Sequence, residues 1–256
     1  MANPRLMVDA ALHAGAMIAL DEGQARHVGA VLRLEEGESL RLFNARDGEW
    51  RAVVASKSKR GMAVKVETQL RQSRETPDLD LLFAPVKRHA TDLIIEKATE
   101  LGVRRIRPVI TQRTIAETVR LDRLNAIARE AAEQTERFDA PELFEAVSLA
   151  KALDGWDASR PLIYADEAGD DETLAWGGES GRAQPIADAL AGLKGKPQAA
   201  LLIGPEGGFT SEERRMLRTL SFVIPVSLGP RILRAETAVI AALSILQALW
   251  GDWREG

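Results

Sequence analysis

"LLIGPEGGFTSEE", residues 201–213, is the stretch of sequence that decides the fold. An apolar run typical of a buried strand leads into a loop in which glycines flank a proline and a carboxylate. A helix-start signature follows over Thr210 to Glu213. A strand that turns sharply into a helix N-terminus leaves backbone N–H groups unpaired at the turn. Turns of this kind commonly hold a nucleotide-like ligand in α/β proteins.

A second unit of the same kind follows along the chain. In "FVIPVSLGPRILRAETAVIAAL", residues 222–243, an apolar strand runs through Gly229 and Pro230 into a helix. Two neighbouring strand-loop-helix units place their loops at the carboxyl edge of a parallel sheet, where both can line one pocket. The alternative is that each loop is only a tight turn.

The composition of the two loops narrows the choice of ligand. They contain neither the glycine and lysine spacing of a phosphate-binding loop nor the dinucleotide fingerprint. Glu206 would also repel a polyphosphate, although Arg231 and Arg234 lie nearby. A nucleoside that carries a positive centre and an amino-acid tail fits better. We therefore expect S-adenosylmethionine as the cofactor.

The pattern of apolar residues changes along the chain. Residues 40–66 alternate as antiparallel strands do, with turn-like segments between them. A polar stretch over residues 71–80 has no periodicity, and strand and helix signals alternate after it to the end. The fold class predicted is α/β, with a small β domain over residues 1–73. A parallel sheet flanked by helices is expected over residues 76–256.

Composition excludes several kinds of site. The chain has no cysteine and only three scattered histidines, so we expect no disulfide and no metal site. No apolar run reaches membrane-spanning length, which favours a cytoplasmic protein. The net charge is −4, but basic residues collect between Arg41 and Arg74. That basic stretch is either a solvated face or an RNA contact.

Three further segments leave alternatives open. On the helix expected over residues 121–141, Glu130, Glu133, Gln134 and Arg137 share a side that is either solvated or ligand-binding. The acidic stretch over residues 166–185 predicts an exposed loop. The final helix is apolar around most of its circumference, which favours a homodimer over a deep single-chain core.

Four stretches together resemble the signatures of a known family. They are "EKATELGVRRIRPV", "REAAEQTER", "LLIGPEGGFTSEE" and "LGPRILRAETAVIAAL". These look like successive motifs of the RsmE-type 16S ribosomal RNA uridine-N3 methyltransferases of the SPOUT class. The stretch "RHVGAVLRLEEGESLRLFNARDGEWRA" is similar to the family's PUA-like β-barrel. The resemblance implies a trefoil-knotted C-terminal domain, S-adenosylmethionine, a homodimer, and methylation of one uridine in the 16S rRNA of the 30S subunit.

The resemblance and the charge pattern assign residues to three roles. The cofactor-binding set is Ile203, Gly204, Pro205, Glu206, Gly207, Gly208, Leu228, Gly229, Ile232, Leu233, Thr237 and Ala238. The catalytic set is Glu133, Gln134, Arg137, Arg234 and Glu206, in which Arg137 and Arg234 stabilise uracil charge or anchor phosphate and a carboxylate, Glu133 or Glu206, assists proton removal. The set expected to bind RNA phosphates is Arg26, His27, Arg33, Lys57, Lys59 and Arg60.

Two other functions stay open from the sequence. One is a ribose 2′-O methyltransferase, an activity of related SPOUT enzymes. The other is a ribosome-assembly factor that binds RNA without catalysis, in which the glycine loops are only turns.

Overall fold

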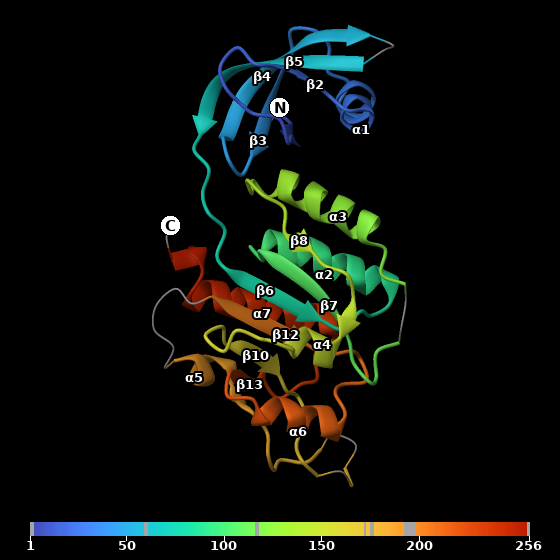
Figure 1. Ribbon diagram of the computed structural model, residues 1–256, viewed down its shortest axis with the longest axis vertical. Coiled ribbons are helices and arrows are strands. Elements are labelled where there is room, and N and C mark those ends of the chain that lie inside the picture. The colour runs from blue at the N-terminus through green and yellow to red at the C-terminus, as the bar shows by residue number, and fades with distance from the viewer. Residues whose placement is uncertain are drawn as a thin grey trace. The chain divides into compact units, whose positions relative to one another are not determined.

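The computed structural model divides the chain into two compact units (Figure 1). One unit comprises Met1–Glu75 with Ala132–Ala140, and the other comprises Thr76–Ala131 with Pro141–Gly256. The structure describes residues 3–58, 61–115, 118–171, 173–174, 177–191 and 198–254. Nothing in the sequence pattern indicated that residues 132–140 belong to the first unit.

The first unit is built on a five-stranded sheet in the order β1-β3-β4-β5-β2. Its elements are β1 (Arg5–Met7), β2 (Met17–Ala19), α1 (Glu22–Arg26), a π-helical turn (His27–Val31), β3 (Ser39–Asn44), β4 (Gly48–Ser58) and β5 (Gly61–Arg71). β3, β4 and β5 pair in antiparallel fashion, which confirms the meander expected over residues 40–66. Alternate residues such as Leu42, Ala52 and Val64 are fully buried in its core.

The second unit contains an eight-stranded sheet. Its elements are β6 (Leu79–Phe83), α2 (Arg88–Glu100), β7 (Arg105–Ile110), α3 (Leu121–Gln134), β8 (Glu142–Leu143), β9 (Val147–Ser148), α4 (Leu149–Leu153), β10 (Leu162–Ala165), β11 (Gln184–Pro185), α5 (Ile186–Leu190), β12 (Ala199–Ile203), α6 (Ser211–Thr219), β13 (Val223–Ser227), α7 (Ala235–Leu249) and a 3-10 turn (Asp252–Arg254). The strand order is β11-β13-β10-β12-β6-β7-β8, with β9 paired to β7, and all of these strand pairs are parallel. The parallel α/β arrangement expected from the sequence is confirmed.

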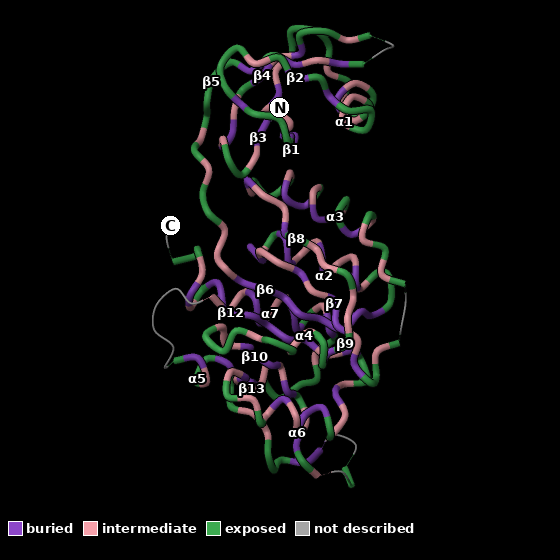
Figure 2. The backbone as a smooth tube through the Cα atoms, in the orientation of Figure 1, coloured by how far each residue is buried: buried purple, intermediate pink, exposed green. Residues whose placement is uncertain are grey.

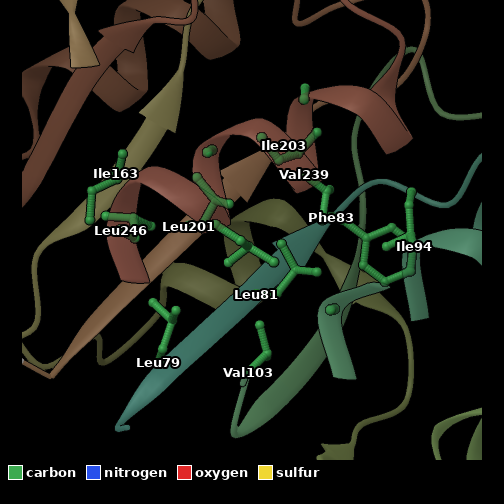
Figure 3. Close-up of a cluster of buried hydrophobic side chains, with 14 of the residues drawn as sticks. Leu79, Leu81, Phe83, Ile94, Val103, Ile163, Leu201, Ile203, Val239 and Leu246 are labelled. Carbon is green, nitrogen blue, oxygen red and sulfur yellow. The ribbon is translucent and has the colours of Figure 1, made fainter. Parts of the chain in front are cut away.

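Helices cover both faces of this sheet. Because successive strand residues point to opposite faces, Leu81, Leu201 and Ile163 join one core cluster with residues of α2, α3, α5 and α7 (Figure 3). Leu82 and Leu202 join a second cluster with residues of α4 and α6. Both faces are therefore dry, and the central strands β6 and β12 are buried along their whole length (Figure 2). This explains why β12 is a continuous apolar run and why β6 is apolar apart from Asp80, which pairs with Arg105 and Arg107.

No helix in the described part of the chain is long and apolar enough to cross a membrane.

Candidate active site

The two glycine-proline loops meet at one pocket of the second unit. β12 and β13 both pair with β10, so their carboxyl ends lie at the same edge of the sheet on either side of it. The residues that line the pocket are Ala165, Asp166, Glu167, Ile203, Gly204, Pro205, Glu206, Val226, Leu228, Gly229, Arg231, Ile232, Leu233, Ala235 and Ala238. The structure thus brings together the predicted cofactor-binding set, apart from Gly207, Gly208 and Thr237.

Close packing explains two glycines of the first loop. A Cβ added at Gly204 would lie 2.5 Å from Cε2 of Phe209, whose ring is buried. Gly208 has φ +66°, a conformation that side chains rarely adopt, and an added Cβ would lie 2.6 Å from Glu167 Oε1. The loop therefore depends on glycine at both positions to reach this shape.

A capping box starts the helix that follows the first loop. Thr210 Oγ1 accepts a hydrogen bond from the Glu213 backbone N–H at 3.2 Å, and Glu213 Oε2 accepts one from the Thr210 N–H at 3.0 Å. This is the reciprocal arrangement that the sequence predicts for α6. It fixes the direction in which the chain leaves the loop.

The end of β10 forms a third wall of the pocket, which the sequence analysis did not anticipate. Ala165, Asp166 and Glu167 follow the apolar run of β10 and line the pocket beside both loops. Their place in the sequence, directly after the apolar run of a buried strand, is the feature that also identifies the other two loops. The prediction that residues 166–185 form an exposed loop is wrong at its first residue, because Asp166 is only 2% exposed.

Two arginines of α6 neutralise Asp166. Asp166 Oδ1 lies 2.8 Å from Arg214 Nε, and Asp166 Oδ2 lies 2.6 Å from Arg218 Nη2. Arg214 also donates hydrogen bonds to the carbonyls of Ala168 and Gly169. Burial of Arg214 lowers the pKa of its guanidinium. The hydrogen bonds and the attraction to Asp166 have the larger combined effect, so the pKa of Arg214 is raised. The chain after β10 is therefore held against α6 by charge-assisted hydrogen bonds.

Glu167 has a different environment from its neighbour. The residue keeps exposed surface, but its carboxylate lies against Gly208 at the end of the first loop. Burial of the carboxylate raises the pKa of Glu167, and the negative charge of Asp166 acts in the same direction. The charges of Arg214 and Arg113 oppose this shift without cancelling it. The Glu167 carboxylate therefore holds a proton more readily than an ordinary glutamate.

The predicted catalytic residues fall into two groups. Glu206 and Arg234 belong to the second unit, where both are exposed and Arg234 is the residue before α7. Glu133, Gln134 and Arg137 belong to the first unit, at and after the end of α3. Their assignment to catalysis stays a prediction.

Contacts within the first unit define the surroundings of this second group. Glu133 Oε1 accepts a hydrogen bond from the Met7 N–H at 2.9 Å, and Arg137 pairs with Asp139 at 3.0 Å. The Arg5 guanidinium donates to the backbone carbonyls of Ala132, Glu133 and Arg137, and it pairs with buried Glu49 at 3.1 Å. Residues 132–140 are thus tied to β1 by hydrogen bonds.

The residues predicted to bind RNA lie on the first unit. Arg33 is exposed, His27 is half-buried, and exposed Arg26 pairs with Glu22 at 3.2 Å. Lys57 Nζ donates to Leu34 O at 3.0 Å and lies 2.7 Å from Glu35 Oε1. Lys59 and Arg60 lie outside the described residues. Binding of RNA by this set stays a prediction.

Within the described ranges, no cluster of three or more histidine, aspartate or glutamate side chains forms a metal site.

Comparison with known proteins shows the family to which the chain belongs. A family model described as an RNA methyltransferase domain matches residues 74–247, and one described as an RNA methyltransferase PUA domain matches residues 20–67. The ribosomal RNA small subunit methyltransferase E of Rickettsia conorii is 31% identical over 218 residues, which cover 85% of this chain and 84% of that protein. The chain belongs to this methyltransferase family.

Solved structures of the family have the same fold. A ribosomal RNA small subunit methyltransferase E from Neisseria gonorrhoeae, bound to S-adenosylmethionine, is 27% identical and has a TM-score of 0.84 over 98% of this chain and 99% of that one. A Legionella pneumophila methyltransferase in complex with the same cofactor is 32% identical and has a TM-score of 0.83 over 98% of this chain and all of that one. The predicted fold class, a SPOUT-type α/β domain preceded by a PUA-like β domain, is confirmed.

Proposed function

We propose that this protein transfers a methyl group from S-adenosylmethionine to N3 of one uridine in the 16S rRNA of the 30S subunit. By family resemblance the target is uridine 1498. The observation that carries the proposal is the pocket in which the ends of β10, β12 and β13 converge. Membership of an RNA methyltransferase family supports the reaction class.

The residues that line the pocket fit S-adenosylmethionine. Ile203, Leu228 and Leu233 supply apolar surface suited to an adenine ring. The ends of the strands supply backbone N–H and carbonyl groups suited to its polar edge. Glu167 and Glu206 supply negative charge for a ligand with a positive sulfur. The same carboxylates disfavour a polyphosphate in this pocket.

The chain's own residues have two tasks in the reaction. S-adenosylmethionine supplies the electrophilic methyl group. Uracil N3 carries a proton at neutral pH, so the protein must favour its loss and stabilise the negative charge that spreads to O2 and O4. We assign charge stabilisation to Arg234 and Arg137, and proton removal to Glu133 or Glu206. N3 also lies on the pairing edge, so the target base must be unpaired when it reacts.

Two further parts of the proposal concern partners. We assign phosphate contacts to Arg26, His27, Arg33 and the turn from Lys57 to Arg60, so binding should weaken steeply as salt rises. We also propose that the protein acts in the cytoplasm as a homodimer. On α7, the apolar residues Ile240, Ile245 and Leu249 keep accessible surface although the helix packs into the core along its other apolar side, which supports pairing with a second copy.

The test is methyl transfer followed by nucleoside analysis. Purified protein is incubated with labelled S-adenosylmethionine and either 30S particles or free 16S rRNA from cells that lack this modification, and the digested RNA is examined by mass spectrometry. We expect 3-methyluridine. Recovery of 2′-O-methyluridine would instead favour the ribose methyltransferase. RNA binding with neither product, and no heat on titration with S-adenosylmethionine, would favour the non-catalytic assembly factor.

A further inference from the structure

A second pocket lies at the same edge of the sheet as the cofactor pocket in which β10, β12 and β13 converge. β6 pairs in parallel with β12, and β7 pairs in parallel with β6, so the chain leaves all three strands at one edge. The second pocket has a volume of about 330 Å³ and is lined by residues that follow β6 and β7. Among the described residues, the two pockets share no lining residue.

The charged side chains that line this second pocket are all arginines. They are Arg88, Arg120 and Arg123, and no carboxylate among the described residues joins them in the lining. Arg123 pairs with Asp92 of α2, whereas no ion pair in the described part of the chain involves Arg88 or Arg120, which are both exposed. Asp122, in the first turn of α3, is exposed and lies outside the lining. This arginine pocket therefore offers two guanidinium groups to an anion.

The floor of the arginine pocket is apolar and held in place. Val86 and Leu124 line it and are each only 2% exposed. Thr91 Oγ1 donates a hydrogen bond to the Val86 carbonyl at 2.9 Å and accepts one from the Val86 N–H at 3.2 Å. These bonds fix the turn between β6 and α2, and Arg88 follows that turn as the first residue of the helix. The shape of the pocket is thus set by the fold itself.

Guanidinium groups beside an apolar floor suit one nucleotide of RNA. A guanidinium binds phosphate oxygens through paired N–H donors. Apolar side chains can cover a ribose or the face of a base, and bases stack readily on such surfaces. Pockets for small ligands typically measure about 300–1,000 Å³, so the arginine pocket is large enough for a single nucleotide.

We propose that the arginine pocket binds a nucleotide of the substrate RNA that flanks the methylated uridine, with its phosphate on Arg88 and Arg120. The inference rests on the proposed function, which brings RNA to this edge of the sheet. The Ala84 N–H, directly after β6, donates to the carbonyl of Ile203 at 3.0 Å, and Ile203 lines the cofactor pocket. Neighbouring strands lie about 4.8 Å apart, so an RNA strand whose target base enters the cofactor pocket reaches the arginine pocket within a few nucleotides.

A contact with a flanking nucleotide acts on binding and not on the chemical step. It is present equally in the bound substrate and in the transition state, so its loss raises the KM for RNA and leaves kcat unchanged. Loss of one phosphate contact also makes binding less sensitive to salt. For a single strand, the slope of log K against log salt concentration should become shallower by about 0.7.

The experiment measures filter binding of the full chain to labelled 16S rRNA that lacks the modification, at several salt concentrations, together with the kinetics of methyl transfer. Arg88→Gln and Arg120→Gln each remove one exposed charge from the pocket. We expect each to weaken RNA binding about fivefold and to raise the KM by the same factor. The value of kcat and the calorimetric affinity for S-adenosylmethionine should stay within about twofold.

Arg254→Gln is the matched control. Arg254 is also exposed, but it lies beyond the far end of α7, which begins at the cofactor pocket (Figure 1). It is therefore at the opposite edge of the sheet, and its replacement should leave RNA binding and its salt dependence unchanged.

A second variant tests the pocket without removing an arginine. Thr118 is exposed and lines the arginine pocket, so Thr118→Glu places a carboxylate beside the proposed phosphate position. We expect it to weaken RNA binding at least as much as Arg120→Gln does, because the new charge repels phosphate. Thr219→Glu, at the exposed end of α6, adds the same charge elsewhere and should have little effect.

Each outcome decides the question. If the unaltered protein neither binds nor methylates the RNA, the proposed function itself fails. If the unaltered protein methylates RNA, and both arginine variants behave like Arg254→Gln, the arginine pocket is refuted as an RNA site. A fall in kcat at unchanged KM, or weaker binding of S-adenosylmethionine, would also refute it, since the arginines would then act on the reaction or on the cofactor pocket. Should an arginine variant fail to fold, Thr118→Glu decides in its place.

Discussion

Replacing Asp166 by asparagine tests the ion pairs that hold the chain after β10. The Asp166 side chain is 0% exposed and that of Arg214 is 10% exposed, with 2.8 Å between Oδ1 and Nε. Removing one partner of a buried ion pair costs about 3–5 kcal/mol, because the remaining charge loses its partner without regaining water. Asparagine keeps one acceptor oxygen but turns an N–H₂ group toward a guanidinium. We therefore expect Asp166→Asn to lower the free energy of unfolding by about 3 kcal/mol.

Urea denaturation followed by circular dichroism measures this loss. The midpoint should fall while the slope stays unchanged, since the variant exposes a similar surface on unfolding. Asp170→Asn is the matched control, because Asp170 pairs with Arg218 at 3.0 Å but its side chain is 51% exposed. An exposed pair contributes less than about 1 kcal/mol. Equal losses in the two variants would refute the reasoning that burial sets the energy of the Asp166 pairs.

Four further predictions follow from single contacts. The buried Tyr164 hydroxyl has no hydrogen-bond partner within the described residues, and an unsatisfied buried hydroxyl costs free energy. Tyr164→Phe should therefore raise the free energy of unfolding by about 1 kcal/mol. A lower unfolding free energy in scanning calorimetry would contradict this. Thr210→Ala removes the capping box of α6 and should cost about 1 kcal/mol in urea denaturation, against little change for exposed Thr219→Ala at the helix end. Gly208→Ala places a Cβ at positive φ and against Glu167, so the first loop must shift. Titration calorimetry should then show weaker binding of S-adenosylmethionine. An unchanged affinity would speak against a role for this contact. A hydrogen bond from Arg41 lowers the pKa of Glu136, although burial acts in the opposite direction. The ionised Glu136 therefore stabilises the fold above the ordinary glutamate pKa, and this stabilisation is lost as pH falls. Glu136→Gln should lose less stability in acid than the unaltered protein when unfolding is followed by circular dichroism, and identical acid profiles would contradict this contribution.

Much of the fold and half of the pocket could be predicted because their signals are local. Alternation over residues 40–66 was enough to place β3, β4 and β5, since an antiparallel meander pairs neighbouring strands. The two glycine-proline loops each carry their own strand, turn and helix signals. Their convergence followed from the general rule that parallel strands end at one edge of a sheet.

The rest depended on contacts that no local pattern encodes. β10 pairs with both β12 and β13, although it precedes both in the chain, and this order is what brings Glu167 to the pocket. The acidic composition after β10 indicated an exposed loop, but Asp166 is buried because Arg214 and Arg218 reach it from α6. Likewise, Glu133 looked like part of a helix surface, whereas its carboxylate accepts a hydrogen bond from Met7.

The return of residues 132–140 to the first unit limits how the protein can be divided. The polypeptide passes from one unit to the other three times, so no single cut yields two intact halves. A fragment that stops at Glu75 would leave Met7 and Phe43 without Ala132 and Phe138, which complete their apolar cluster, and Arg5 without its carbonyl acceptors. Excision of the β domain for separate use therefore requires the nine-residue return segment to be grafted back, either as a linked extension or as an added peptide.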